Sequence, residues 1–208
     1  MDTQASYDQV AAEYAKRIYT ELAYKPFDRE QLARFAGQVK GLGPICDLGC
    51  GPGQVARYLR DQGAAVLGVD LSPGMLQQAK ALNPDLDFFQ GSMLALDFAD
   101  ATWGGIAAFY SIIHIPRHEV TRALAEMKRV LRPGGRLLLA FHIGDEVLHL
   151  EEWWEKSVAV DFVFFQGLEM ERYLQTVGFV VEESLERDAY PDVEHQSRRA
   201  YIVARKVD

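Results

Sequence analysis

Three glycines and an aspartate are the first residues whose types and spacing indicate a chemistry. Gly49, Gly51 and Gly53 follow a short apolar stretch, in Ile45-Cys46-Asp47-Leu48-Gly49-Cys50-Gly51-Pro52-Gly53. Glycines allow a tight turn and let a ligand lie against bare backbone. Asp70 ends the next apolar stretch, 21 residues after Gly49. A carboxylate in that place accepts hydrogen bonds from the two hydroxyls of a ribose, so the pattern predicts a nucleotide-like ligand at the carboxyl ends of two neighbouring strands.

The glycine spacing distinguishes two classes of cofactor. A dinucleotide-binding turn has the spacing G-x-G-x-x-G, in which the third glycine permits close packing of the helix beneath the pyrophosphate. In this chain Gln54 stands at that third position, and the spacing is G-x-G-x-G. A NAD(P)-dependent oxidoreductase is therefore the less favoured alternative.

Four segments resemble motifs of the class I S-adenosylmethionine-dependent methyltransferases, and they occur in that family's order. Residues 47–54 resemble motif I, residues 69–76 the acidic-loop segment, residues 90–93 the next motif and residues 131–136 the segment before the fifth strand. Tyr7-Asp8…Ala11…Tyr14 is similar to the lead-in helix of the family. The resemblance is to the small-molecule type, with a methyltransferase type 11/25-like domain. It implies S-adenosyl-L-methionine as cofactor, S-adenosyl-L-homocysteine as product, and transfer of the methyl group to a small-molecule acceptor by in-line displacement.

The resemblance also implies where the two ends of the cofactor lie. The turn of residues 49–53, Cys50 included, would lie against the methionine part. Asp47 would orient this turn or meet the ammonium group through water. Asp70 would hold the ribose.

The adenine would be held by residues that follow the second and third strands. Leu71 and Met75 would pack against the ring, although Met75 is equally well explained as a core residue. Ser92 stands where the family more often has Asp, and a hydroxyl accepts a hydrogen bond less strongly than a carboxylate does. The backbone amide of Met93 is the alternative contact at the adenine edge.

Three further residues would complete the cofactor site in the same resemblance. Tyr110 and Ser111 end the fourth strand and would face the sulfonium or the methionine carboxylate. Tyr14 would be a lid contact.

Two histidines near strand ends are candidate general bases for the transfer. His114 follows the fourth strand and His142 ends the fifth. A histidine near its unperturbed pKa can take a proton from an attacking hydroxyl or amine. The alternative for each is a neutral side chain that is hydrogen-bonded into the pocket wall. No metal site is expected, because Pro116 separates His114 from His118 and the pair need not share a helix face.

The apolar periodicity predicts an α/β chain with a Rossmann-like, doubly wound, seven-stranded sheet. The sheet should be mostly parallel with an antiparallel C-terminal strand, and helices should cover both faces. Asp28 is the expected N-cap of the second helix. Helices are expected at 4–24, 28–41, after Gly53, from Ser72-Pro73, at 116–131 and near 168–177, and strands at 45–49, 65–70, 86–89, 106–111, 137–141, 179–187 and 198–205.

We expect a single methyltransferase domain over residues 1–208, with four parts. Residues 1–43 would form a helical lid and residues 44–143 the cofactor-binding core. Residues 144–167 are rich in aromatic side chains and would form a substrate-side insert. In this insert Trp153 and Trp154 are adjacent, so that on a helix both would not enter one pocket. Residues 168–208 would form a helix and an antiparallel strand pair.

Composition excludes several classes of protein. The chain has 22 Lys and Arg against 30 Asp and Glu, with a net charge of −8 and a 49% share of hydrophobic residues. Disorder is therefore not expected, and neither is binding to nucleic acid or to a membrane. The polar start and the two cysteines, Cys46 and Cys50, fit a cytoplasmic protein with reduced thiols. A monomer or a homodimer is expected.

Overall fold

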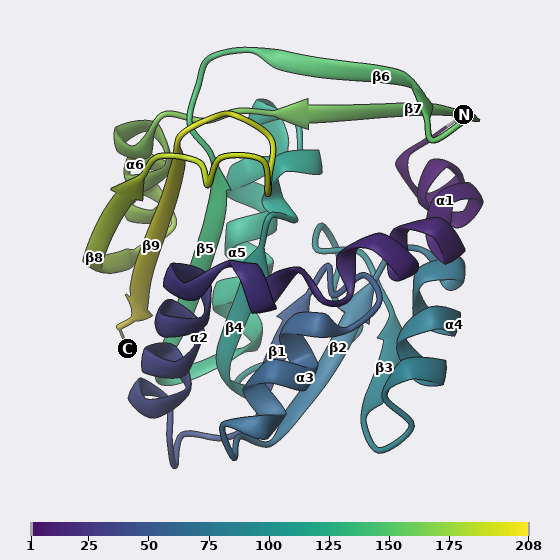
Figure 1. The fold of residues 1–208 in the computed structure, drawn as a ribbon. Coiled ribbons are helices and arrows are strands. Elements are labelled where there is room, and N and C mark those ends of the chain that lie inside the picture. The colour runs from purple at the N-terminus through teal and green to yellow at the C-terminus, as the bar shows by residue number, and fades with distance from the viewer. Residues whose placement is uncertain (1, 208) are drawn as a thin grey trace.

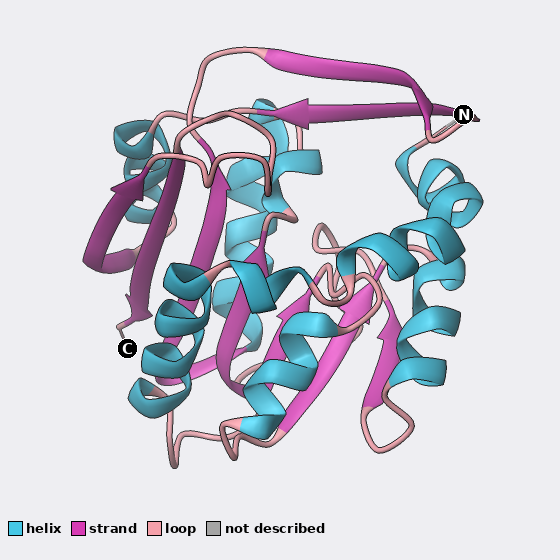
Figure 2. Cartoon of the chain, viewed as in Figure 1, coloured by secondary structure: helices cyan, strands magenta, loops and turns pink. Residues whose placement is uncertain are grey.

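The computed structural model describes residues 2–207, which form a seven-stranded sheet and a separate two-stranded hairpin. The main sheet has the order β3-β2-β1-β4-β5-β9-β8 (Figures 1 and 2). Its neighbouring strands pair in parallel except at β9, which is antiparallel to both β5 and β8. The predicted α/β architecture is thus confirmed. The strands are β1 (Ile45–Leu48), β2 (Val66–Asp70), β3 (Asp87–Gln90), β4 (Trp103–Phe109), β5 (Leu131–His142), β8 (Phe179–Arg187) and β9 (Arg199–Lys206).

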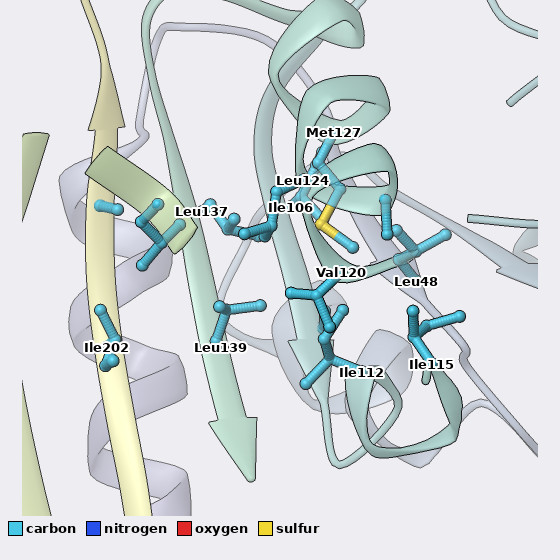
Figure 3. Packing of buried hydrophobic residues seen from close by; sticks show 14 of the residues in the cluster. Leu48, Ile106, Ile112, Ile115, Val120, Leu124, Met127, Leu137, Leu139 and Ile202 are labelled. Carbon is cyan, nitrogen blue, oxygen red and sulfur yellow. The ribbon is translucent and has the colours of Figure 1, made fainter. Parts of the chain in front are cut away.

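Helices cover both faces of this sheet, because residues along each central strand alternate between two hydrophobic clusters. On β5, Leu137 and Leu139 pack into one cluster with helices α5 and α6, whereas Leu138 packs into the other with α2 and α3. Figure 3 shows Leu139 of β5 beside Val120 of α5 within the first cluster. The helices are α1 (Thr3–Ile18), α2 (Pro26–Gln38), α3 (Gln54–Asp61), α4 (Pro73–Leu82), α5 (Val120–Val130) and α6 (Gly167–Thr176), with short 3-10 helices η1 (Glu21–Tyr24), η2 (Ile112–His114) and η3 (Arg117–Glu119).

Local sequence explains where several helices begin. The side chain of Asp2 accepts a hydrogen bond from Ala5 N at 2.8 Å and caps α1. Ser72 caps α4 in the same way, through Met75 N at 3.0 Å, and proline follows it at the first helical position. These caps satisfy backbone N–H groups that have no partner within the helix.

Two predictions about the N-terminal helices are wrong. The expected helix at 4–24 ends at Ile18, and η1 follows after a turn. The second helix begins at Pro26 with Lys25 as its N-cap, so Asp28 lies inside its first turn. Asp28 is fully buried, and it accepts hydrogen bonds from Tyr201 Oη at 2.9 Å and from Arg187 Nη2 at 2.7 Å. A tertiary contact, rather than helix capping, therefore accounts for this carboxylate.

The aromatic segment after β5 forms a β-hairpin, for which the sequence interpretation had no element. Strands β6 (Val147–Trp153) and β7 (Lys156–Val163) pair in antiparallel fashion. Trp153 faces Lys156 across a two-residue turn in which Trp154 and Glu155 have φ values of 51° and 61°. Such turns are usually marked by Asn or Gly, and neither is present here. The apolar residues at every second position, Val158, Val160 and Phe162, were the available signal in the sequence.

The strand order reverses between β1 and β4, and helix α1 and the β6–β7 hairpin lie over that point. In Figure 1 the hairpin crosses the upper end of the molecule and α1 runs in front of the strand ends. Ser6 of α1 ties the two together, because its Oγ accepts a hydrogen bond from Ala159 N of β7 at 2.9 Å. In an open α/β sheet, ligands bind outside the carboxyl ends of the strands at such a reversal.

Candidate active site

A cavity of about 450 Å³, which we call the strand-end cavity, lies at the carboxyl ends of β1, β2 and β4. Its volume lies within the usual range of small-molecule sites. Most of the residues proposed to bind the cofactor are brought together here. The lining residues are Asp2, Thr3, Gln4, Tyr7, Tyr14, Leu48, Gly49, Gly51, Asp70, Leu71, Met75, Gly91, Ser92, Met93, Leu94, Ser111, His114, Ile115 and Pro116.

The glycine turn presents bare backbone to this cavity. Gly49 and Gly51 have φ values of +74° and +52°, which favour glycine. A Cβ at Gly49 would collide with the Cβ of Ser111, whereas a Cβ at Gly51 would meet only Tyr14 Cε1, at 3.8 Å. The space over Gly51 is therefore open to a ligand.

Asp70 connects this turn to the end of β2. Its Oδ2 accepts a hydrogen bond from Gly51 N, and its Oδ1 accepts one from Ser72 N, each at 2.8 Å. Burial raises the pKa of Asp70, while these backbone N–H groups oppose the shift. Each carboxylate oxygen has more than one acceptor position. Asp70 can therefore hold the turn and still accept hydrogen bonds from a diol.

Asp47, Cys50 and Gly53 support the turn from behind and do not line the cavity. Asp47 is buried, and its Oδ2 accepts a hydrogen bond from Ala56 N of α3 at 2.9 Å. Burial raises the pKa of Asp47 to about 8, and the bond from Ala56 opposes the shift. Of the two roles implied for Asp47, the geometry favours orientation of the turn and of α3. The thiols of Cys46 and Cys50 are both free and buried.

The side of the cavity expected to hold adenine is lined by Leu71, Met75, Ser92 and Met93. Met75 is only 1% exposed and also belongs to a hydrophobic cluster with α1 and β7, so it is both core and wall. Ser92 Oγ accepts a hydrogen bond from Leu94 N at 3.2 Å, which shapes the loop after β3.

The two residues that follow β4, Tyr110 and Ser111, line different cavities. Ser111 lines the strand-end cavity, and its Oγ donates a hydrogen bond to Leu48 O at 2.6 Å. Tyr110 does not line it and points instead toward Tyr201, whose hydroxyl lies 2.7 Å from its own. The backbone of Tyr110 has a φ of 53°, which turns the chain between the two side chains.

Tyr110 lines a second cavity of about 740 Å³, which we call the outer cavity. Helix α1, the hairpin and the loop before β9 enclose it. Tyr7 and Tyr14 belong to the walls of both cavities and thus separate them. The lining residues are Tyr7, Tyr14, Ile18, Glu21, Lys25, Tyr110, Ile113, His142, Trp153, Phe162, Pro191, Asp192, Val193, Glu194, His195, Gln196 and Arg199.

The two histidines proposed as bases lie in different cavities. His114 lines the strand-end cavity and His142 the outer cavity. Burial lowers the pKa of His114 to about 4. Burial, followed by the charges of Arg199 and His195, lowers the pKa of His142 to about 3. Each is hydrogen-bonded into the wall, His142 through Nδ1 to Ser197 Oγ at 2.9 Å.

The charged floor of the outer cavity was missed by sequence reasoning. The side chains of Lys25, Glu194 and Arg199 are nearly buried, and the Glu194 carboxylate pairs with both cations. Glu194 also pairs with Arg187, which reaches Asp28. These residues come from α2, β8, β9 and a loop, and no local spacing links them.

Comparison with known proteins gives a matching family model and several similar proteins. A family model described as a methyltransferase domain matches residues 45–135. A demethylmenaquinone methyltransferase of Renibacterium salmoninarum is 36% identical over 96 residues, which cover 46% of this chain and 40% of that protein. A malonyl-[acyl-carrier protein] O-methyltransferase of Erwinia billingiae is 33% identical over 130 residues, 61% of this chain and 49% of that protein. Over residues 45–135 the chain thus matches a methyltransferase domain, and both of these similar proteins are methyltransferases.

The likeness extends to the fold. A solved S-adenosylmethionine-dependent methyltransferase from Methanosarcina mazei superposes with a TM-score of 0.71 at 17% identity, over 79% of this chain and 92% of that one. The chain spans half or less of the length of the two methyltransferases matched by sequence. S-adenosylmethionine is the cofactor of the family, and the open backbone at Gly51 beside the Asp70 carboxylate fits it.

Two other kinds of site are absent from the part of the chain that the structure describes. Among residues 2–207, no three His, Cys, Asp or Glu side chains are grouped so that they could hold a metal ion. Within the same range, no helix is both long and apolar enough to cross a membrane.

Proposed function

We propose that this domain transfers a methyl group from S-adenosylmethionine in the strand-end cavity to a small-molecule acceptor in the outer cavity. The observation that carries the proposal is the shared wall of Tyr7 and Tyr14 between the two cavities. When bound, the cofactor supplies an electrophilic methyl group on a sulfonium. The chain's own residues must hold the acceptor in line with it and exclude water.

The cofactor-binding residues keep the roles that their positions support. The turn at Gly49 and Gly51, with Ser111 behind it, accommodates the methionine part. Asp70 accepts hydrogen bonds from the ribose hydroxyls. Leu71, Met75, Ser92 and Met93 surround the adenine, Tyr14 covers the site, and Asp47, Cys50 and Gly53 support the turn.

The acceptor side is formed by residues 144–167 together with the N-terminal helices. Trp153 and Phe162 supply apolar surface to the outer cavity, while Trp154 packs against Tyr14 and below the Arg17 guanidinium. Enclosure by the hairpin favours a small acceptor over a nucleic acid. Neutral His142 is a hydrogen-bonding group for that acceptor.

The first experiment is a thermal-shift series with S-adenosylmethionine, S-adenosylhomocysteine, NAD and NADP. A ligand present at about 100 times its Kd stabilises the folded state by about 2.7 kcal/mol. We expect a shift with the two sulfur nucleotides only. A shift with NAD instead would contradict the assignment of the cofactor.

The second experiment distinguishes an enzyme from a silent binding module. Release of S-adenosylhomocysteine is measured with a panel of small phenols and amines. Binding without release from any acceptor would favour the module, which is the alternative function. A cytoplasmic location and a monomeric or homodimeric state remain predictions, to be measured by fractionation and ultracentrifugation.

Replacement of Asp70 tests the ribose contact. Asp70→Asn loses an acceptor with a full negative charge, and such hydrogen bonds are worth about 1.5–3 kcal/mol. We therefore expect the Kd for S-adenosylhomocysteine, measured by calorimetry, to rise about 10- to 100-fold. Asp87→Asn is the control, because Asp87 is exposed at the start of β3. Equal affinities in the two variants would contradict the role of Asp70.

A further inference from the structure

Tyr7 lies between the two cavities and is hydrogen-bonded to His114. Its Oη lies 2.8 Å from His114 Nε2, and the two residues are 107 positions apart. Tyr7 contributes to the walls of both cavities, whereas His114 contributes only to the strand-end cavity. An acceptor in the outer cavity can therefore contact Tyr7, and it can reach His114 only through Tyr7.

The contacts of the His114 ring determine which nitrogen carries its hydrogen. Nδ1 lies 3.0 Å from the backbone carbonyl oxygen of Asp161, in β7. A carbonyl oxygen only accepts hydrogen bonds, so Nδ1–H must be the donor. The neutral ring has one such hydrogen, which leaves Nε2 with a free lone pair that accepts from the Tyr7 hydroxyl. Burial lowers the pKa of His114 to about 4, which keeps the ring neutral at neutral pH.

Aromatic contacts hold the Tyr7 ring in place. Its centroid lies 5.2 Å from that of His114, 5.7 Å from Trp153 and 5.9 Å from Tyr14, each in an edge-to-face arrangement. Burial, followed by the charges of Tyr14 and Asp70, raises the pKa of Tyr7 well above its usual value. The phenol therefore stays protonated at rest, and it can take a proton only as it gives up its own.

We propose that Tyr7 is a catalytic residue that relays the proton of the acceptor to His114 during methyl transfer. This proposal rests on the proposed function. The acceptor heteroatom forms a bond to the methyl carbon, the bond from that carbon to sulfur breaks, and its electron pair stays on sulfur. The proton of the acceptor passes to Tyr7 Oη while the phenolic hydrogen passes to His114 Nε2. The imidazolium that results loses its proton to water after the products leave.

The relay predicts an acceptor that carries a proton on its nucleophilic atom, such as a hydroxyl or a neutral amine. Tyr7 Oη offers a hydrogen-bond acceptor at the boundary of the two cavities once its hydrogen points at Nε2. Because both ring nitrogens of His114 are engaged, the ring does not need to contact the acceptor.

The first arm of the test is spectroscopic and needs no cofactor. Long-range ¹H–¹⁵N correlation spectra of histidine-labelled protein report which ring nitrogen carries hydrogen. We expect His114 to have hydrogen on Nδ1 and none on Nε2, and we expect the Nε2 shift to change in Tyr7→Phe. Hydrogen on Nε2 in the wild type would overturn the relay.

The second arm is kinetic. It uses whichever phenol or amine of the panel gives the fastest release of S-adenosylhomocysteine. General-base catalysis contributes about 10²- to 10⁴-fold, so Tyr7→Phe and His114→Ala should each lower kcat at least about 100-fold. The double variant should lose little more, because the two residues act as a unit. The Kd for S-adenosylhomocysteine should stay within about twofold in Tyr7→Phe, which loses only a hydroxyl, and Tyr24→Phe, at an exposed tyrosine, is the matched control.

The outcomes separate this proposal from the proposed function. A wild type that turns over, with Tyr7→Phe retaining its kcat, would overturn the relay alone. A wild type that binds S-adenosylhomocysteine and releases none from any acceptor would overturn the proposed function and the relay with it.

Discussion

Gly49 illustrates how one backbone position limits the site at the scale of a residue. Its φ of +74° is shared by Gly134, which lies in β5 between the paired residues Leu131 and Arg136. The surroundings of the two glycines differ, because a Cβ at Gly134 would meet nothing within 4 Å, whereas one at Gly49 would collide with Ser111. Comparison of the two glycines therefore separates the free-energy cost of the backbone conformation from that of the collision.

We predict that Gly49→Ala destabilises the protein more than Gly134→Ala does. Each substitution carries about 1–2 kcal/mol for a side chain in the left-handed region. Overpacking against Ser111 adds about 1–3 kcal/mol in Gly49→Ala alone. Urea unfolding of the two variants measures the difference. Equal midpoints would mean that the turn moves away from Ser111 without cost.

At the scale of elements, a buried charge network joins α2 to the C-terminal strands. Asp28 of α2 contacts Arg187 of β8 and Tyr201 of β9, and Arg187 also pairs with Glu194. An exposed pair, Arg34 with Glu183, joins the same helix to β8. Breaking a buried pair leaves the other charge without its partner, whereas an exposed pair contributes little.

We predict that Asp28→Asn lowers the free energy of unfolding by about 3–5 kcal/mol. Glu183→Gln, the same kind of change on the exposed pair, should cost about 1 kcal/mol or less. Both values come from urea unfolding. A cost for Asp28→Asn as small as that of Glu183→Gln would show that the network does not hold α2 in place.

At the scale of the whole molecule, stability depends on pH through buried groups that act in opposite directions. The pKa of His142 falls from 6.5 to about 3 on burial, so the unfolded chain binds a proton in this interval that the folded chain does not. This contribution to stability is present above pH 6.5 and is lost as pH falls. The pKa of Asp47 rises to about 8, so its contribution is lost as pH rises toward 8.

We predict that His142→Gln removes one of these contributions and leaves the other. Between pH 7.5 and pH 5 the wild type should lose about 2 kcal/mol more than His142→Gln does, at about 1.4 kcal/mol for each pH unit below 6.5. Unfolding curves at both pH values measure this difference, from which the effect of Asp47 cancels. His118→Gln, at an exposed histidine, should follow the wild type. An equal loss of unfolding free energy between the two pH values in His142→Gln and in the wild type would contradict the prediction.

Local order along the chain was determined by the sequence alone. The alternation of strands and helices, the glycine turn and Asp70 were all predicted, because periodicity and spacing over a few residues report which backbone conformations fit. Prediction was wrong where local signals were weak or misleading. Trp154 and Glu155 form a hairpin turn without Asn or Gly. The position of Asp28 in the sequence resembles that of a helix cap, but its carboxylate accepts a hydrogen bond from the distant Arg187.

Only the tertiary structure decided which distant side chains meet. Asp28 and Arg187 are 159 positions apart, and Tyr7 and His114 are 107 apart. Each pair forms because the strand order and the packing of α1, α2 and the hairpin bring separate elements together at one end of the sheet. Spacing in the sequence carries no record of that packing. The cofactor site could therefore be predicted from its motifs, whereas the outer cavity and the proposed proton relay required the folded chain.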